Sequence, residues 1–332
     1  MDISERFALE DGDATKAPPQ MISAPVIFAP VIFAPAWAWV AFTLFAAGGQ
    51  TLRNALQRDL TDKLGAACAT FVRFLFGCPF AFLILAGACA IANVPPPAPR
   101  AHTLLVIAAA AALQIAATAL MLVSMKERSF VIVTALLKTE AAQLVVFGLL
   151  FLGEAATPAL ALGAFCATLG VLALSLPDPA AALRGAPWRP IFYGLAAAAL
   201  FGGSTVLYRE GVLALGGPSI MVAAATELVL GLVLQTALIL LYLGVFDRGG
   251  LFAIVAQWRE SLSAGLLGAF ATLFWFLAFA LETAPRVRTL ALIEVLFAQM
   301  VTRRMFAQKT GAREWLGLAM LVAGVAAVLN GG

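Results

Sequence analysis

The chain repeats itself once, at a constant offset of 154 residues, which is the separation of Glu140 from Glu294. No gap is needed to keep the two copies in register. Self-similarity at one fixed period indicates that a single structural unit is used twice. The other matching pairs are Gly48 and Gly202, Gly49 and Gly203, Thr51 and Thr205, Gly77 and Gly231, Thr118 and Thr272, Gly163 and Gly317, and Gly170 and Gly324.

Composition indicates a protein that is solvated mainly by lipid. Hydrophobic residues make up 62% of the 332 residues and charged residues only 12%, whereas a soluble domain carries about 25% charge. The net charge of +3 is small for this length and gives no footprint for nucleic acid. We therefore expect the lipid bilayer as a partner, and no nucleic acid.

Metal, disulfide and nucleotide chemistry find little support. The four cysteines, Cys68, Cys78, Cys89 and Cys166, lie in apolar stretches without a CxxC pair, and His102 is the single histidine. Neither a disulfide framework nor a zinc site is indicated. The chain also lacks the GxxxxGK[ST], HExxH and GxSxG motifs, so we expect no cofactor and no ATP hydrolysis.

Each copy contains five apolar segments, and a membrane-spanning helix needs about 20 such residues. Because five is odd, the second copy must enter the membrane inverted. The predicted fold is an all-α polytopic membrane protein with ten transmembrane helices, arranged as two inverted five-helix repeats. The expected spans are 37–57, 66–92, 103–125, 130–152 and 158–176, then 191–211, 220–246, 257–279, 284–306 and 312–330.

The two copies divide the chain into four parts. Residues 1–35 form an N-terminal tail, whose three late prolines argue against a spanning helix there. Residues 36–176 form the first repeat, 177–190 a linker and 191–330 the second repeat. The acidic start of the tail is unlike a cleavable signal peptide, which begins with basic residues.

Five charged side chains toward the middle of the expected spans are the candidates. Placing one at the bilayer centre costs about 2.5–3.5 kcal/mol on insertion scales, so each should face a partner or a wet cavity. Glu140 and Glu294 are equivalent in the repeat. Arg73 and Glu227 are equivalent with opposite charges, so they could face each other across a pseudo-twofold axis. Lys138 has no charged counterpart and lies about 200° around the helix from Glu140, so each needs a partner on another helix.

Two interpretations of these charges stay open. In the functional one, they line a binding cavity between the copies, and one carboxylate binds and releases a proton. In the structural one, they are static ion pairs that hold helices together.

Neutral polar side chains form stripes that could line the same cavity. Gln50 and Asn54 share a face of the first span, and Tyr208 takes the place of Asn54 in the second copy. Interhelical hydrogen bonding, or packing for Trp275, is the alternative explanation. The candidates for the substrate or proton pathway are Gln50, Asn54, Arg73, Gln114, Thr118, Lys138, Glu140, Tyr208, Glu227, Trp275 and Glu294.

Basic residues are distributed unevenly between the two ends of the expected helices. The connections after spans 2, 4, 6 and 8 hold only four: Arg100, Arg209, Arg286 and Arg288. Because basic loops favour the cytoplasmic side, this asymmetry places both termini on the opposite side. The other end holds Arg58, Lys63, Lys126, Arg128, Arg184, Arg189, Arg248, Arg259, Lys309 and Arg313.

Three features together resemble one known family over roughly residues 37–330. They are the two five-helix copies, the Leu-Gly-Glu sequence at 152–154 that ends span 4, and Gly163 and Gly170 in the helix that follows. The chain resembles the EamA family of the drug/metabolite transporter superfamily. The resemblance implies a permease of the bacterial inner membrane that works by alternating access, often as an exporter of amino acids or related metabolites, with cytoplasmic termini.

The sequence departs from the family pattern in three places. The second copy has Phe-Ala-Gln at 306–308 instead of Leu-Gly-Glu, and Ala141 and Val295 stand where the family often has proline. The Lys-Thr-Glu sequence at 138–140 is also more polar than the family norm. These departures leave the substrate open.

Our leading hypothesis is a secondary-active transporter of small amphipathic metabolites, coupled to protons or another gradient, rather than an enzyme. An intramembrane enzyme that acts on a lipid-linked substrate is the first alternative, and a membrane scaffold or sensor is the second. Because two complete copies could form a full pathway, a monomer suffices, and a homodimer stays open.

Overall fold

The computed structural model of this chain describes residues 35–127, 130–152, 157–176, 188–296 and 312–331. Within these ranges the side chains of some helical residues, including Asn54, lie outside the described part.

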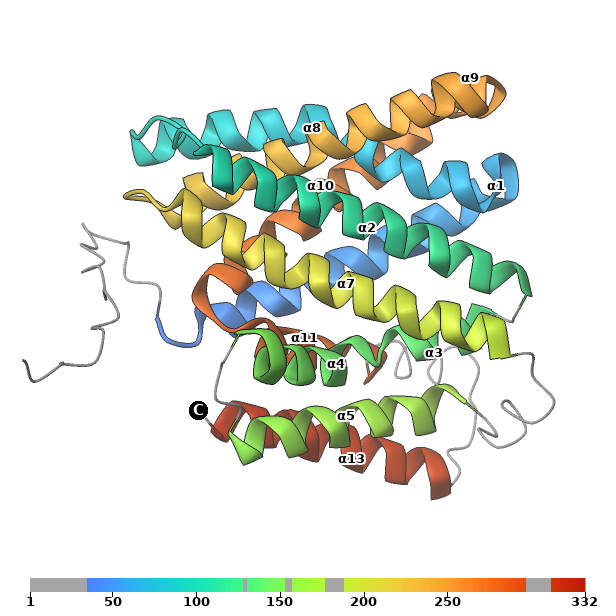
Figure 1. Ribbon diagram of the computed structural model, residues 1–332, viewed down its shortest axis with the longest axis vertical. Helices are drawn as coiled ribbons and strands as arrows, with labels where there is room; N and C mark the ends of the chain where they lie inside the picture. The colour runs from blue at the N-terminus through green and yellow to red at the C-terminus, as the bar shows by residue number, and fades with distance from the viewer. Residues whose placement is uncertain (1–34, 128–129, 153–156, 177–187, 297–311, 332) are drawn as a thin grey trace, which may run out of the picture. The chain divides into compact units, whose positions relative to one another are not determined.

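Long apolar helices dominate the described residues, which contain no strand (Figure 1). Eight helical segments there are long and apolar enough to cross a membrane, so the chain is an all-α polytopic membrane protein. The elements are α1 (Ala38–Ala92), α2 (Ala101–Glu127), α3 (Phe130–Leu137), α4 (Glu140–Phe147), the π-helical turn η2 (Gly148–Leu152), α5 (Pro158–Ser175), α7 (Trp188–Leu215), α8 (Ile220–Phe246), α9 (Arg248–Ala256), α10 (Trp258–Leu281), α11 (Ala284–Ala291) and α13 (Ala312–Asn330).

The eight segments coincide with eight of the ten expected spans. Of the other two, 37–57 lies in the first half of α1, and 284–306 begins with α11 and continues outside the described residues. The total of ten spans, and the repeat of five, therefore stay predictions. Most of the expected linker and the tail also lie outside the described part.

The first long helix, α1, is two helices joined at Gly65. The backbone of Gly65 has φ of 75° and ψ of 159°, a conformation open to glycine because it has no Cβ. On either side of this break, Arg53 and Arg73 both pack against Gly268 of α10. The chain therefore reverses direction between them (Figure 1). The sequence predicted a loop here, and the structure has a sharp helical corner.

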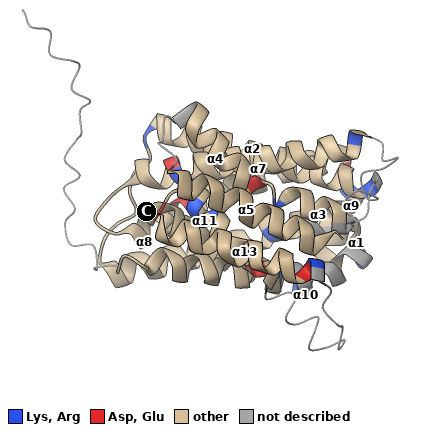
Figure 2. Ribbon diagram, turned by 90° about the horizontal axis from the view of Figure 1, so that it is seen from below, with Lys and Arg blue, Asp and Glu red and all other residues tan. Residues whose placement is uncertain are grey.

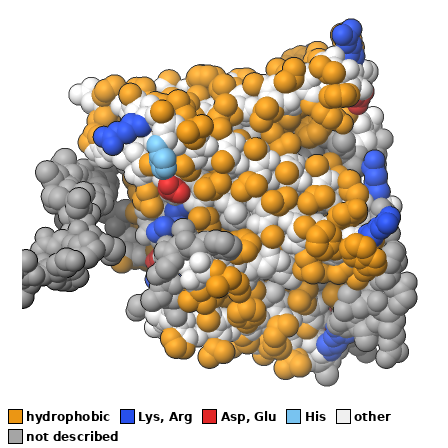
Figure 3. Space-filling model, in the orientation of Figure 1, with side chains coloured by type: hydrophobic (Ala, Val, Ile, Leu, Met, Phe, Trp, Pro, Cys, Tyr) orange, Lys and Arg blue, Asp and Glu red, His pale blue; other side chains and the backbone are white. Residues whose placement is uncertain are grey.

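The outer surface carries a broad apolar band. Figure 3 shows hydrophobic side chains over the middle of one face, with Lys and Arg near its ends. Leu83, Leu105 and Leu162 are 68%, 70% and 71% exposed. Soluble monomers rarely expose large contiguous apolar patches, whereas hydrocarbon solvates such side chains well. The band is therefore the surface expected to face lipid.

Helices α5 and α13 lie side by side and touch backbone to backbone (Figure 1). Gly163 faces the carbonyl of Gly324, and Gly317 faces the carbonyl of Gly170. A Cβ on any of these four glycines would come within 2.9 Å of backbone, which explains the small residues here. The 154-residue offset maps the first contact onto the second.

The structure changes the count of basic residues at the two ends of the helices, from which the orientation in the membrane is predicted. Arg286 and Arg288, which were counted with the connection after span 8, belong to α11. Arg286 is ion-paired with Glu282 at 2.8 Å, and Arg288 is 82% buried in the interior. Figure 2 shows Lys and Arg gathered near the end of the bundle that holds α9, and others between helices around α11. The contrast between the basic end and the opposite end is therefore sharper than the sequence indicated.

This contrast predicts that the end holding α9 is cytoplasmic and that the C-terminus is not, because basic loops are retained in the cytoplasm. Alkaline phosphatase fused after residue 332 should be active, and a green fluorescent protein fused there should be dark. The same reporters inserted between α5 and α7 provide the matched control and should give the reverse pattern. A fluorescent C-terminal fusion would contradict the prediction and agree with the cytoplasmic termini of the EamA family.

Candidate functional site

Two helices that carry candidate charges are interrupted, at positions 154 residues apart. Helix α3 ends at Leu137 and α4 begins at Glu140. In the second copy α11 ends at Ala291, and the chain is helical again from Glu294. Each candidate glutamate is thus the first residue of a new helical segment, where the helix dipole favours a negative charge.

At both breaks the backbone hydrogen bonds change from the i→i−4 spacing of an α-helix to the i→i−3 spacing of a 3₁₀ turn. The amide of Thr139 donates to the carbonyl of Leu136 at 3.0 Å, and the amide of Ile293 donates to that of Leu290 at 3.0 Å. In the first break, the Thr139 hydroxyl also donates to the Leu136 carbonyl, at 2.6 Å. Neither break contains a proline, so the sequence predicted continuous spans here and missed both breaks.

Each glutamate is ion-paired with a basic side chain from the other copy. Lys138 pairs with Glu294, and Arg288 Nε lies 3.0 Å from Glu140 Oε1, although its N–H is not aimed at that oxygen. All four side chains are at least three-quarters buried. The expectation that Lys138 and Glu140 find separate partners on other helices is confirmed.

Arg288 is held by more than its carboxylate partner. Its Nη2 donates to the Thr205 hydroxyl at 3.0 Å, and that hydroxyl donates to Glu140 at 3.1 Å. Its guanidinium lies 4.5 Å from the centre of the Trp275 ring and 5.5 Å from that of Phe279. This cation–π contact stabilises the charge in the interior.

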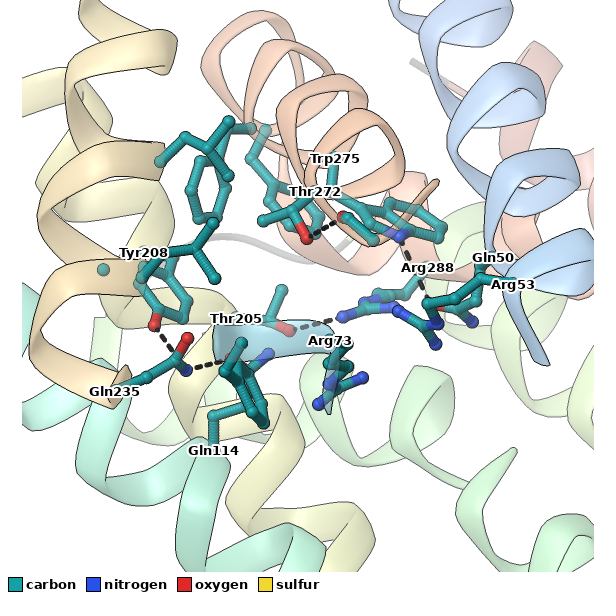
Figure 4. Close-up of a pocket in the computed structure, with 17 residues that line it drawn as sticks. Gln50, Arg53, Arg73, Gln114, Thr205, Tyr208, Gln235, Thr272, Trp275 and Arg288 are labelled. Atoms are coloured by element: carbon teal, nitrogen blue, oxygen red, sulfur yellow. Dashed lines mark hydrogen bonds between the residues drawn. The ribbon is translucent and has the colours of Figure 1, made fainter. Parts of the chain in front are cut away.

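A polar cavity of about 60 Å³ lies beside these ion pairs (Figure 4). Residues of α1, α2, α7, α8, α10 and α11 line it, so both copies contribute. The polar and aromatic residues that Figure 4 labels around it are Gln50, Arg53, Arg73, Gln114, Thr205, Tyr208, Gln235, Thr272, Trp275 and Arg288.

Hydrogen bonds fix most of the neutral side chains around the cavity. The amide of Gln235 donates to the Tyr208 hydroxyl at 3.1 Å and to the Gln114 side-chain oxygen. The Trp275 indole donates to the Gln50 side-chain oxygen at 3.3 Å. Each bond joins two different helices, so these side chains also hold the walls together.

Two arginines from α1 enter the cavity from opposite sides of the Gly65 corner. Arg53 and Arg73 meet over Gly268, where a glycine leaves room for both side chains. The Nε of Arg73 is buried without a hydrogen-bond partner among the described residues. Its guanidinium lies 4.3 Å from the centre of the Phe74 ring.

Glu227 lies behind the cavity wall. Its side chain is fully buried, and neither carboxyl oxygen has a hydrogen-bond partner in the described part of the chain. Gly211 makes room for it, because a Cβ there would collide with the carboxyl. Tyr208 lies within electrostatic reach of both Glu227 and Arg73. The sequence suggested that Arg73 and Glu227 could face each other, and the structure shows no ion pair between them.

The structure brings together most of the predicted pathway residues. Gln50, Arg73, Gln114, Tyr208 and Trp275 line the cavity. Glu140, Glu294 and Lys138 do not line it. Glu140 is paired with Arg288, which does, and Glu294 lies within electrostatic reach of the lining residue Arg53.

Thr118 does not line the cavity. Its side chain is 1% exposed, and its hydroxyl donates to the carbonyl of Gln114 in its own helix at 2.8 Å. The side chain of Asn54 lies outside the described residues.

Sequence reasoning missed Arg53, Gln235 and Arg288. Arg53 precedes Asn54 near the expected end of a span, where a long basic side chain usually reaches the membrane surface. Arg288 was read as a loop residue for the same reason. The signal that could have found it is the stripe of Pro285, Arg288 and Leu292 at helical spacing.

Metal binding has no support in the described part of the chain. No three side chains of His, Cys, Asp or Glu gather there in a way that could hold a metal ion. The polar groups of the cavity are guanidiniums, amides and hydroxyls, of which guanidiniums repel cations.

Comparisons with known proteins bear on the fold. No family model and no curated protein matches this chain. A solved chain described only as "Crystal structure of protein" is similar over 87% of this chain and 98% of its own length, with a TM-score of 0.64 and 16% sequence identity. At that identity the likeness shows the fold alone.

The buried pair of Glu140 and Arg288 predicts a strong energetic coupling, since each single substitution leaves a charge in the interior without its partner. Glu140→Ala and Arg288→Ala should each destabilise the protein, and the double variant should be more stable than the sum predicts, by about 1–3 kcal/mol. Unfolding in detergent–denaturant mixtures measures these free energies.

The half-exposed pair of Lys63 and Glu260, at 2.6 Å, is the matched control for this cycle. Its coupling should stay below about 1 kcal/mol, because water screens an exposed pair. Additive losses at Glu140 and Arg288 would show that the pair contributes no mutual stabilisation.

Proposed function

We propose that this protein is a secondary-active transporter of small metabolites that works by alternating access. The observation that carries the proposal is a polar cavity in the interior of a multi-pass membrane protein, lined by helices from both halves of the chain. Polar groups inside a membrane are costly and are retained mainly along the paths of solutes and ions.

The helix breaks support the same proposal. Interrupted helices at the centre of a membrane protein supply helix ends for binding and mark the substrate site in many transporters. Here the two breaks are equivalent under the 154-residue offset, and the ion pairs beside the cavity lie next to them. We propose accordingly that the chain has ten spans in two inverted five-helix repeats, as in the EamA family, and resides in the bacterial inner membrane.

The size of the cavity fits a transporter in a closed arrangement. Binding pockets for drug-sized ligands have volumes of about 300–1,000 Å³, and this cavity has about 60 Å³. That volume holds a few water molecules at about 10–15 Å³ each. A metabolite would enter only if the helices that line the cavity moved apart on one side, which is the movement that alternating access requires.

The alternative of an enzyme that acts on lipid-linked substrates finds no comparable support. Such a site needs acidic or basic catalytic groups beside a lipid-facing groove. A groove of about 270 Å³ does lie between α4 and α5, but no carboxylate or histidine lines it. Its polar residues are Thr139, Gln143 and Thr168.

Glu227 is the carboxyl that we propose for proton coupling. Glu140 and Glu294 are ion-paired, whereas no group in the described residues neutralises or hydrogen-bonds Glu227. An ionised carboxyl without a partner is costly in a dry interior, so such a group stays protonated there. When water reaches it, the ionised form is stabilised and the proton can leave. Opening of the cavity beside Tyr208 would provide that water.

Counterflow in proteoliposomes tests transport without a driving gradient. Vesicles preloaded with a mixture of unlabelled metabolites should accumulate at least one labelled metabolite, saturably. Gly231→Leu should reduce this at least about tenfold, since Gly231 lines the cavity and faces the Tyr208 ring and a leucine fills volume that a solute needs.

Gly244→Leu is the matched control, because Gly244 lies in the same helix with no neighbouring atom within 4 Å of a Cβ. It should transport like wild type. Counterflow that is equal in both variants, or absent for every metabolite with folded protein, would count against the proposal.

Glu227→Gln should retain counterflow and lose the stimulation of net uptake by a pH gradient, because glutamine cannot exchange a proton. Uptake measured with and without the gradient separates the two effects. Glu260→Gln, at the exposed ion pair with Lys63, should keep the stimulation. A Glu227→Gln protein that responds to the gradient like wild type would exclude this carboxyl as the coupling group.

A further inference from the structure

The side chains that line the cavity carry positive charge and no negative charge. Arg53, Arg73 and Arg288 line it, and no aspartate or glutamate of the described residues does. A cavity that bound cations would be expected to present carboxylates, because opposite charges must meet where water is scarce. The electrostatics of this cavity therefore favour a negatively charged occupant.

Nearby carboxylates do not cancel this charge. Glu140 is paired with Arg288, and Glu294 is paired with Lys138 while lying within electrostatic reach of Arg53. Among the described residues, Arg288 and Lys138 of this cluster each have a carboxylate partner, and Arg73 has none. The positive charge of Arg73 is therefore not balanced by an ion pair with any described carboxylate.

Arg73 is the part of the cluster best placed to meet a ligand. None of the described carboxylates forms an ion pair with it, and its buried Nε donates to no acceptor there. Arg53 lies beside it over Gly268 and within electrostatic reach, so two like charges lie close together. An anion between them would relieve this repulsion and accept the Nε–H bond.

We propose that the cavity binds the oxyanion group of a small organic anion, a carboxylate or phosphate, and that anions are the substrates of the transporter proposed above. Guanidinium forks match the paired oxygens of both groups. Trp275 and Phe279, stacked at 5.9 Å with an angle of 17° between their rings, would pack against the carbon skeleton.

The same geometry disfavours zwitterionic amino acids, which the sequence suggested as substrates. An ammonium group needs acceptors, and the side-chain oxygens of Gln50 and Gln114 already accept from Trp275 and Gln235. Three guanidiniums would also repel it. The cavity can satisfy a carboxylate but offers little to the ammonium beside it.

The test measures thermal stabilisation of the detergent-solubilised full chain by succinate, inorganic phosphate, L-alanine and choline at constant ionic strength. Succinate or phosphate should raise the melting temperature in a saturable manner, whereas L-alanine and choline should not. The response to succinate against phosphate identifies which oxyanion is preferred. Stabilisation by L-alanine or choline that equals that of both anions would overturn the proposal.

Substitutions of Arg73 test whether the stabilising anion binds in this cavity. Arg73→Gln should weaken anion binding by about 10- to 100-fold, because a charged hydrogen bond is lost, and Arg73→Lys should weaken it less. Lys63→Gln removes the same charge from the same helix at an exposed position and should bind like wild type. Equal anion binding by wild type and folded Arg73→Gln would place the anion elsewhere.

The inference and the transport proposal on which it rests can fail separately. Counterflow of L-alanine in a protein that no anion stabilises would retain transport and overturn the anionic substrate. Saturable, Arg73-dependent binding of succinate or phosphate without counterflow of any solute would retain the anion site and overturn transport.

Discussion

A charge in the hydrocarbon core of a membrane has no water to solvate it, so its partner must come from the protein itself. That constraint organises the centre of this molecule. Lys138 and Glu294, 156 residues apart, are joined in one ion pair, and Arg288 and Glu140 in another. Both pairs depend on the helix breaks, because the breaks place the two glutamates at the starts of helical segments. The fold brings residues of both halves of the chain together in these pairs, and side chains of both halves line the cavity.

Glycine provides the space in which the charges gather. Gly65 allows α1 to reverse direction, and Gly268 lets two arginines of that helix lie against the same point of α10. At the far side of the bundle, Gly163 and Gly324 bring α5 and α13 into backbone contact. In lipid, helices gain little by burying apolar surface, so close contact through small residues provides the attraction instead. The cavity therefore lies among helices that pack closely through glycine residues.

The proposed repeat provides a symmetric frame, but the groups inside it are asymmetric. Gln114 corresponds to Gly268, and Arg73 to Glu227, so one copy supplies a polar side chain where the other supplies space or the opposite charge. This asymmetry gives the cavity a positive character that neither copy alone would indicate. It also separates two tasks in the proposed mechanism, since the arginines would hold an anion and Glu227 would exchange a proton behind the wall.

The sequence by itself determined the class of the protein, the positions of the described spans, and the set of interior charges, because hydropathy and the cost of burying charge are local properties of the chain. It also indicated correctly that Lys138 and Glu140 have separate partners, although the helix is interrupted at Lys138. It could not show whether Arg73 and Glu227 meet, because equivalent positions in a repeat touch only close to the axis that would relate the copies. Cys166 and Met320 show such a contact, 3.4 Å from Sγ to the carbonyl oxygen. Only the tertiary structure decided how deep Arg53 and Arg288 lie and where the helices break. Depth depends on the path of the whole helix and on its neighbours, and a cavity is formed by side chains from six helices that no local pattern brings together.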